Sequence, residues 1–342
     1  MAVRIGFIGT GGIATAHLVR LHGLADVEVV GVADITVDRC EAAVARVNGM
    51  VSSRTQAGEP PARLMAPKAF ADAAKMISAT GPDAVYIAVP PFAHGEPERA
   101  VIDAGKHIFV EKPVGLDLKL VRGIEARIKD AGLISGVGYQ SRCSDAVAGA
   151  KEALAGRTIG LIQGNYFGAL PGSPWWRVQA RSGGQMIEQA THTADLMRYL
   201  AGEVATVYAA AATRLVGDAE GLDIFDVNTV TMKFRDGTVG TLSNSCGLDF
   251  QGGPGWFHGV TALTRGLAVN VWLNQATYWR QGIEEIRTAQ LDPMREQDRI
   301  FVEAVATGDP SGIRSDYTNG VRSLQVTLAV EESARSGRPV DL

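Results

Sequence analysis

The first 140 residues alternate short apolar runs with segments of helical periodicity. Val, Ile and other apolar residues are concentrated at 3–9, 27–34, 83–90, 107–113 and 133–139, and helical spacing occurs between several of these runs. Continuous apolar runs are typical of strands buried on both faces, as in a parallel sheet with helical crossovers. The pattern predicts an α/β fold that begins with a Rossmann-type, doubly wound parallel sheet.

From about residue 141 the pattern changes to strands with few helices between them. Runs that predict strands occupy 159–170, 205–215, 225–234, 237–248, 258–272 and 276–287. Asp236 and Gly237 have the Asp-Gly signature of a tight hairpin. Helical spacing returns at 295–308 and 318–337. We therefore expect two domains, the first at 1–140 and the second at 141–342, the latter an α+β domain with a large, mostly antiparallel open sheet.

A glycine-rich loop follows the first apolar run and opens a helical segment. It reads GTGGIA (residues 9–14) and matches the G-x-G-x-x-G/A spacing of dinucleotide-binding folds. In that arrangement the first glycine permits a tight turn, the second lets the backbone approach a pyrophosphate, and the third small residue allows close helix–strand packing. We expect Gly9, Gly11, Gly12, Ile13 and Ala14 to bind a dinucleotide.

An acid at the end of the second apolar run bears on which dinucleotide is bound. Asp34 lies about 20 residues beyond Ala14, where a carboxylate can accept hydrogen bonds from both adenosine ribose hydroxyls. The same charge would repel a 2′-phosphate, so the sequence favours NAD over NADP. Arg39 lies nearby and could moderate this charge. The alternative for Asp34 is a loop acid that caps the next helix.

Composition and charge exclude several other classes. The 342 residues carry a formal net charge of −4, which argues against a nucleic-acid surface. No apolar run approaches the roughly 18 residues that span a bilayer. Cys40, Cys143 and Cys246 are far apart and unpaired in pattern, so they indicate neither a disulfide framework nor a metal site. We expect a protein of the reducing cytoplasm that interacts with neither nucleic acid nor membrane.

A second chemical motif lies in the stretch SGGQMIEQATHTADLMRYLAG, residues 182–202. Ser182 and Gln185 have capping-box spacing, which predicts that one helix begins just after Ser182. Glu188 and His192 would then be i and i+4, one turn apart on the same face. Asp195 is three residues beyond His192, where it would either orient the imidazole or be solvated. Most lone helical histidines are structural, but this one follows a glycine pair and a nearby acid.

Four separated motifs, in order along nearly the whole chain, resemble the glucose–fructose oxidoreductase/inositol dehydrogenase (Gfo/Idh/MocA) family. They are GFIGTGGIA, AVPPFAHGE, AGKHIFVEKPVGLD and the stretch at 182–202. The resemblance implies a Rossmann domain followed by an α+β domain whose open sheet commonly mediates oligomerisation, so we expect a homodimer or homotetramer. It also implies an enzyme that oxidises or reduces pyranoses, cyclitols or related polyols with NAD(P).

The resemblance assigns roles to individual residues. Lys112 matches the lysine of the family's E-K-P motif, which binds the reacting hydroxyl, and Glu111 and Pro113 complete the motif beside the nicotinamide. His192 matches the histidine taken as the general acid/base. Glu188 stands where many members have aspartate, which leaves the role of this carboxylate open.

The chemistry of these residue types agrees with such roles. Oxidation of a secondary alcohol needs a base for the hydroxyl proton and a cation that favours the developing alkoxide, while the cofactor takes the hydride. Lys112 follows an apolar strand of a parallel sheet, at the edge where open α/β sheets bind ligands. The imidazole of His192 has a proton affinity suited to neutral pH. We therefore name Lys112, His192 and Glu188 as candidate catalytic residues.

Other polar and aromatic residues are weaker candidates. Pro90 and His94 follow an apolar run and are expected to contact the nicotinamide ribose side, with His94 more often a structural or cofactor-contact residue than a catalyst. Residues expected to contact substrate are Tyr139, Arg142, Tyr166, Trp175 and Trp176. For the two tryptophans the alternative is that they fasten their loop to the core or to another subunit.

These observations predict an NAD-dependent dehydrogenase that acts on a ring hydroxyl of a sugar, sugar derivative or cyclitol. Two alternatives share the fold: a reductase of a related imine or keto-sugar, and a non-catalytic sensor of sugars or dinucleotides. Retention of both Lys112 and His192 argues against the sensor.

Overall fold

The computed structural model describes residues 2–56, 64–250 and 257–342. The chain divides into two compact units, Met1–Gly138 with Met294–Thr318, and Tyr139–Pro293 with Asn319–Leu342. The expected boundaries assign all of 141–342 to the second domain, whereas the structure places Met294–Thr318 in the first unit. The apolar residues of this segment explain the difference, because Phe301, Val302 and Ala304 are buried in the core of the first unit.

The first unit contains the predicted parallel sheet. Its six strands have the order β3-β2-β1-β4-β5-β6, and all pair in parallel. The strands are β1 (Val3–Ile8), β2 (Val27–Ala33), β3 (Lys68–Phe70), β4 (Ala84–Ile87), β5 (His107–Val110) and β6 (Ser135–Val137). The helices are α1 (Gly12–His22), α2 (Val37–Gln56), α3 (Ala73–Thr80), η1 (Pro91–Ala93), α4 (Glu96–Asp103), α5 (Leu118–Asp130), α10 (Pro293–Thr307) and η5 (Pro310–Gly312).

The continuous apolar character of the central strands matches their burial. Every residue of β4 is buried, as are the last four residues of β1, because helices cover both faces of the sheet. The returning segment is tied to the sheet through backbone as well as side chains. The Val137 N–H donates to the Ser315 carbonyl, and the Tyr317 N–H donates to Ser135 Oγ.

The second unit is a mixed sheet of nine strands in the order β14-β13-β12-β11-β7-β10-β9-β8-β15. The pairs are antiparallel except β7 with β10. The strands are β7 (Ile159–Ala169), β8 (Val204–Ala212), β9 (Val227–Phe234), β10 (Val239–Leu248), β11 (His258–Thr264), β12 (Leu267–Trp272), β13 (Gln275–Arg280), β14 (Ile283–Thr288) and β15 (Val340–Asp341). The predicted Asp-Gly turn joins β9 to β10.

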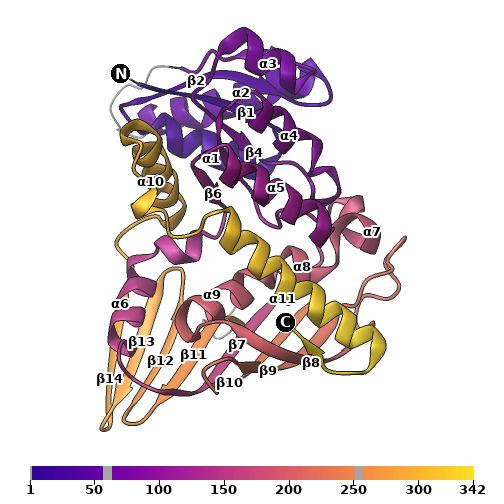
Figure 1. The fold of residues 1–342 in the computed structure, drawn as a ribbon, viewed down its shortest axis with the longest axis vertical. Coiled ribbons are helices and arrows are strands. Elements are labelled where there is room, and N and C mark those ends of the chain that lie inside the picture. The colour runs from indigo at the N-terminus through magenta and orange to yellow at the C-terminus, as the bar shows by residue number, and fades with distance from the viewer. Residues whose placement is uncertain (1, 57–63, 251–256) are drawn as a thin grey trace. The chain divides into compact units, whose positions relative to one another are not determined.

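Helices pack on one face of this sheet and leave alternating exposed side chains on the other. They are η2 (Gln140–Cys143), α6 (Asp145–Leu154), η3 (Pro174–Arg177), α7 (Gln179–Ser182), α8 (Gln185–Glu188), α9 (Thr191–Ala201) and α11 (Tyr317–Ser336). Within this unit, Figure 1 shows α9 and α11 running across the sheet, and their apolar residues share its core. The alternation along β9 fits a sheet covered on one face. Within the described ranges, no helix is long and apolar enough to cross a membrane.

Candidate functional site

The glycine loop leaves the N-terminus of α1 open. Gly9 has φ +86° and a Cβ there would lie 2.4 Å from the Ala88 carbonyl oxygen, so this turn requires glycine. A Cβ at Gly11 or Gly12 would meet no atom within 4 Å, and no side chain caps the helix at Gly11. Ala14 is fully buried against the sheet. The uncapped N–H groups therefore face open space, which fits the pyrophosphate of a dinucleotide.

Asp34 is held beside this loop by four hydrogen bonds. Its Oδ2 accepts from the backbone N–H of Thr10 (2.8 Å) and from Thr10 Oγ1 (2.7 Å), and its Oδ1 accepts from the Ile35 N–H (2.7 Å) and Arg39 Nε (2.9 Å). Burial opposes ionisation of the carboxyl, but these bonds and the Arg39 charge outweigh it and lower the pKa of Asp34. Asp34 is therefore a fixed carboxylate next to the glycine loop, as an acid that binds ribose hydroxyls must be.

The histidine in the loop after β4 is paired with a glutamate. His94 Nδ1 lies 2.5 Å from Glu98 Oε1, and the Gly95 N–H donates to Glu98 Oε2 at 2.6 Å. Both side chains of the His94–Glu98 pair are buried. Pro90 begins this loop at the end of β4 and is half-buried. The pairing favours the structural interpretation of His94 over a catalytic one.

The Glu111–Lys112–Pro113 segment directly follows β5, and the Lys112–Pro113 peptide bond is cis. Glu111 is buried, and its Oε2 accepts the backbone N–H of Lys112 at 3.0 Å. Gly138 provides the space for this carboxylate, because a Cβ at that position would lie 2.2 Å from Glu111 Oε1. Lys112 thus begins at the carboxyl end of β5, in the first unit, as the sequence predicts.

A buried cluster of charged residues lies behind this segment, and no sequence pattern predicts it. His17, on α1, is fully buried, with Nε2 3.0 Å from Glu111 Oε1 and Nδ1 2.7 Å from Asp298 Oδ1. Burial alone would lower the pKa of His17, but Asp298 and Glu111 together raise it to about 9. In the sequence, only the position of His17 on the buried face of α1 indicates this cluster. Its partner Asp298 lies 281 residues away and has no local pattern that links the two.

The predicted helix from Ser182 is instead broken into short pieces. Gly183 and Gly184 adopt φ of +76° and +80°, which ends α7 and begins α8 after Ser182. The Ala190 N–H then bonds the Gln185 carbonyl, five residues back, so the helical ladder is interrupted before α9. Glu188 ends α8 and His192 is the second residue of α9. They are close in sequence but do not share one continuous helix, which corrects the expected i, i+4 arrangement.

Glu188 is bound by an aromatic residue of the same unit. Trp176 Nε1 donates to Glu188 Oε2 at 2.8 Å. The Trp176 ring is only 2% exposed and packs with Ile224 and Cys246. This enclosure and the bond to Glu188 favour the structural alternative for Trp176 over the expected sugar-stacking role. Trp175 is half-buried beside the same cluster and remains a candidate.

His192 and Tyr139 are neighbours within the second unit. Their rings meet edge to face with centroids 5.9 Å apart, and His192 is 8% exposed. Tyr139 Oη pairs with Thr191 Oγ1 at 2.8 Å. Burial and the nearby Asp195 charge raise the pKa of Tyr139. Tyr139 is 1% exposed, which favours a role in packing against the histidine, and its expected substrate contact stays a prediction.

Arg142 is occupied by a buried ion pair. Its Nε and Nη2 each donate to Asp195 at 2.8 Å, and Ser323 Oγ donates to Asp195 Oδ1 at 2.7 Å. Arg142 is 5% exposed and Asp195 is fully buried. The ion pair favours a structural role for Arg142, whose expected substrate contact stays a prediction. Asp195 is not solvated, which corrects one of its two interpretations.

Tyr166 belongs to an aromatic group on the sheet of the second unit. Its ring contacts His258 edge to face at 4.6 Å, and His258 stacks on Trp272 at 5.9 Å. The preceding residue is joined to the helix that carries His192, because Thr193 Oγ1 donates to the Asn165 carbonyl at 3.3 Å. Tyr166 is half-buried, which is compatible with the expected substrate contact.

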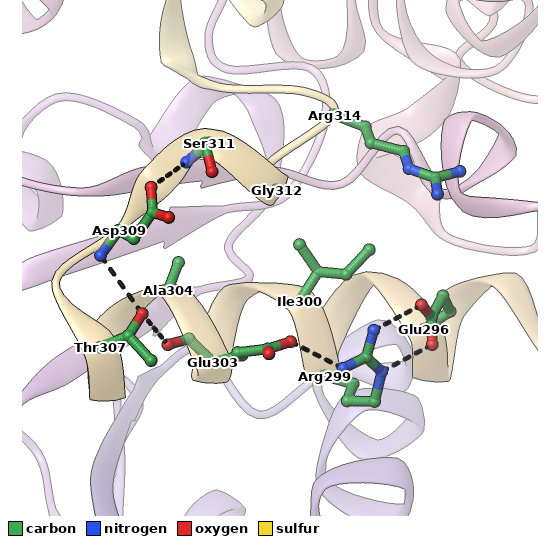
Figure 2. A pocket seen from close by; sticks show the side chains of 10 residues that line it. All are labelled: Glu296, Arg299, Ile300, Glu303, Ala304, Thr307, Asp309, Ser311, Gly312 and Arg314. Atoms are coloured by element: carbon green, nitrogen blue, oxygen red, sulfur yellow. Dashed lines mark hydrogen bonds and ion pairs between the residues drawn. The ribbon is translucent and has the colours of Figure 1, made fainter.

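One pocket of about 360 Å³ lies elsewhere in the first unit, between α10 and η5. Figure 2 shows its charged lining, where Arg299 is bound by Glu296 and Glu303 at 2.7 Å each. The lining also holds Arg314 and Asp309, so it carries both signs of charge, with Arg299 paired to two of its three acids. None of the candidate site residues lines it.

The predicted site residues are therefore divided between the two units. The glycine loop, Asp34 and the Glu111–Lys112–Pro113 segment belong to the first unit. Glu188 and His192 belong to the second.

Comparison with known proteins identifies two family models along the chain. The model described as "Oxidoreductase family, NAD-binding Rossmann fold" (GFO_IDH_MocA) matches residues 3–139, and the GFO/IDH/MocA C-terminal domain model matches residues 148–259. Together these cover more than half of the sequence.

Curated relatives match over most of their length. The myo-inositol 2-dehydrogenase of Thermotoga maritima is 27% identical, over 99% of this chain and 98% of that protein. The scyllo-inositol 2-dehydrogenase (NAD⁺) of Bacillus subtilis is 27% identical, over 79% of this chain and 81% of that protein. The fold is similar to that of the WlbA dehydrogenase of Bordetella pertussis in complex with NADH and UDP-GlcNAcA, with a TM-score of 0.79, 23% identity, and 100% and 99% of the two chains covered.

Proposed function

The chain belongs to the GFO/IDH/MocA family of NAD-binding oxidoreductases, and from this we propose that it transfers a hydride between NAD and a ring hydroxyl or ketone of a sugar, sugar derivative or cyclitol. The observation that carries the proposal is the match to a myo-inositol dehydrogenase along 99% of the chain. Both residues that the chemistry needs, Lys112 and His192, are present within that match.

The residues of the chain supply the proton chemistry and the charge. His192 accepts the hydroxyl proton of the substrate during oxidation and returns it during reduction. The Lys112 ammonium stabilises the negative charge that develops on the same oxygen. Glu188, held by Trp176, supplies a carboxylate one methylene longer than an aspartate would. The bound nicotinamide accepts or returns the hydride.

The cofactor preference follows from the first unit. Asp34 is a fixed carboxylate beside the glycine loop, and a second negative charge from a 2′-phosphate would be repelled there. Arg39 already bonds Asp34 and thereby reduces part of this repulsion. NAD is therefore the proposed cofactor, with NADP used less efficiently.

The test is a screen of cyclitols, pyranoses and anhydrosugars for NADH formation at 340 nm, with NAD and NADP in parallel. We expect turnover with at least one cyclic polyol and a higher kcat/KM with NAD. Tight NADH binding without turnover on any cyclic polyol would favour the sensor instead. Turnover confined to imines or keto-sugars would favour the related reductase.

Two substitutions test whether Lys112 and His192 carry out the reaction. We expect Lys112→Ala and His192→Ala each to lower kcat by about 10²- to 10⁴-fold. NADH titration by fluorescence should show that His192→Ala still binds the cofactor. Full turnover by either variant would refute its assigned role.

We further propose that the chain forms a homodimer or homotetramer through the exposed face of the nine-stranded sheet. Strand register places five apolar residues in one row across that face, namely Trp279, Ala268, Leu263, Leu161 and Val239. Trp279, Leu263 and Val239 are 39%, 37% and 48% exposed. A continuous apolar row of this kind is typical of a surface that another protein covers.

Light scattering after gel filtration tests this arrangement. A Leu161→Lys/Leu263→Lys variant should elute as a monomer, because two charges would be desolvated in the interface. Leu291→Lys, on an exposed residue outside the sheet, is the matched control and should keep the wild-type mass. A monomeric wild-type protein would refute the proposal.

A cytoplasmic location is also proposed, on the basis of the thiols. Cys40, Cys143 and Cys246 are all free and buried, as expected in a reducing compartment. Cell fractionation with a cytoplasmic marker tests this, and recovery in the secreted fraction would refute it.

A further inference from the structure

Three segments that are distant in sequence place ionisable groups in the core of the first unit. His17 comes from α1, Glu111 from the end of β5, and Asp298 from α10. His17 and Asp298 are fully buried and Glu111 is 4% exposed. Charged side chains are almost never so enclosed unless they are paired, and enclosing them costs free energy.

Each ring nitrogen of His17 faces a carboxyl oxygen. Nε2 of His17 faces a carboxylate oxygen of Glu111 at 3.0 Å, and Nδ1 faces one of Asp298 at 2.7 Å. A carboxylate can only accept, so both ring nitrogens donate when both acids are ionised. The rings of Tyr86 and Phe109 pack against the imidazole, with centroids 5.3 and 5.2 Å away, and fix its plane.

Glu111 connects this cluster to the backbone of Lys112. One of its oxygens accepts from His17 while the other accepts the Lys112 N–H. Gly138 leaves room for the carboxylate, since a Cβ there would lie 2.2 Å from Oε1. A chain of hydrogen bonds thus runs from Asp298 through His17 and Glu111 to the peptide that carries the Lys112 side chain.

Stability alone does not account for the cluster. Well-packed apolar side chains of similar volume often stabilise a core as well as a buried ion pair does. The charged cluster also fixes an orientation. Two hydrogen bonds hold the Glu111 carboxylate, and a third holds the imidazole that makes one of them, so the position of the Lys112 peptide is set. Groups that orient a functional side chain in this way commonly affect activity as strongly as they affect folding.

We propose that His17 and Asp298 are positioning residues for Lys112, acting through Glu111. The proposal rests on the proposed function only in that Lys112 binds the reacting hydroxyl. Neither residue contacts substrate, and each acts by holding the backbone from which the Lys112 amine projects.

The first test reads the position of Lys112 without any substrate. The full-length protein is acylated with a limiting amine reagent, and mass spectrometry compares the labelling rate of Lys112 with that of exposed Lys75. We expect His17→Gln and Asp298→Ala to change this ratio by about three-fold or more, because the environment of the amine changes. Asp298→Asn keeps an acceptor for Nδ1 and should restore most of the wild-type ratio. His22→Gln, at the end of the same helix, is the control.

The second test uses turnover on whichever polyol the screen identifies. His17→Gln should lower kcat by about ten-fold or more with a smaller change in the KM for NAD. The double variant His17→Gln/Lys112→Ala should have nearly the same kcat as Lys112→Ala alone, because the effect of His17 passes through the lysine. Leu18→Ala, a buried substitution in the same helix, should lower Tm without this coupling to Lys112.

The outcomes separate the two hypotheses. An unchanged labelling ratio in both His17→Gln and Asp298→Ala refutes the positioning role, whether or not a substrate is found. Additive effects in the double variant also refute it. Absence of turnover in the screen refutes the proposed function, while the labelling result still decides the role of His17.

Discussion

Trp176 donates its indole N–H to Oε2 of Glu188 at 2.8 Å, and the ring that makes this bond is 2% exposed. The bond gives a physical reason for a glutamate, and not the shorter aspartate, at this position. The longer side chain reaches an indole that lies in the core cluster with Ile224 and Cys246. The carboxylate is therefore held by a residue that has no exposed face of its own.

Replacing this donor tests its effect. Trp176→Phe should lower kcat about ten-fold and the free energy of unfolding by about 1 to 3 kcal/mol, because a hydrogen bond to a charged group is lost. Steady-state kinetics and urea unfolding measure the two effects. Trp279→Phe removes the same kind of bond, to Glu284 on the proposed interface sheet, and serves as the comparison once light scattering shows that its mass is unchanged. Unchanged kcat in Trp176→Phe would show that Glu188 does not depend on the indole.

The cofactor preference should respond to Asp34. Asp34→Ser removes the charge beside the glycine loop, so we expect the preference for NAD over NADP, measured as the ratio of kcat/KM values, to fall by about ten-fold or more. Arg39→Ala should raise this ratio, because Asp34 loses its positively charged partner and repels a 2′-phosphate more strongly. A ratio unaffected by Asp34→Ser would show that Asp34 serves only to fix Thr10.

Stability should decline at alkaline pH through His17. Its pKa of about 9 in the folded protein exceeds the ordinary value of about 6.5, so its contribution is complete below about 6.5 and is lost as pH rises through about 9. Asp298 and Glu111 face the imidazole as acceptors, with Tyr86 packed beside it. The free energy of unfolding should fall by up to about 3 kcal/mol over this interval.

Urea unfolding between pH 6 and 10 measures this loss. The His17→Gln variant has no imidazole to titrate and should show a flatter profile. Equal slopes in the two proteins would contradict the raised pKa.

Arg142 should behave as a structural residue. Arg142→Ala leaves the buried Asp195 carboxylate without its bidentate partner, so we expect the free energy of unfolding to fall by about 3 to 5 kcal/mol. At a temperature where the variant remains folded, its KM for substrate should stay near the wild-type value. A raised KM with unchanged Tm would instead restore the substrate role expected from the sequence.

Local sequence patterns were sufficient for the parts of the fold that depend on neighbouring residues. The buried strands of the first unit, the turn at Gly9 and the hairpin at Asp236-Gly237 each follow from a few adjacent positions. The very short strand β3 has too few residues for a periodic signal. The break between α8 and α9, at Gln189 and Ala190, was missed because an apolar helical pattern continues across it and no glycine or proline marks it.

The missed side-chain roles have a common cause. Arginine is usually found at the surface, but Arg142 is buried with Asp195, which lies 53 positions away in the sequence. His17 is paired with Asp298, which lies 281 positions away. Local periodicity carries no information about such partners. Residue type therefore suggested ligand contacts for Arg142, Tyr139 and Trp176, where tertiary packing instead encloses them.

The return of the chain at Met294 has a consequence for biosynthesis. As the protein leaves the ribosome, residues 1–138 emerge complete in sequence but without Phe301 to close their core and without Asp298 to balance His17. The nascent cofactor-binding unit must wait for the whole of 139–293 to be translated before its last helix arrives. A gene fragment that stops at Gly138 should therefore yield an aggregation-prone product, and an independent nucleotide-binding module would need residues 294–318 joined to it.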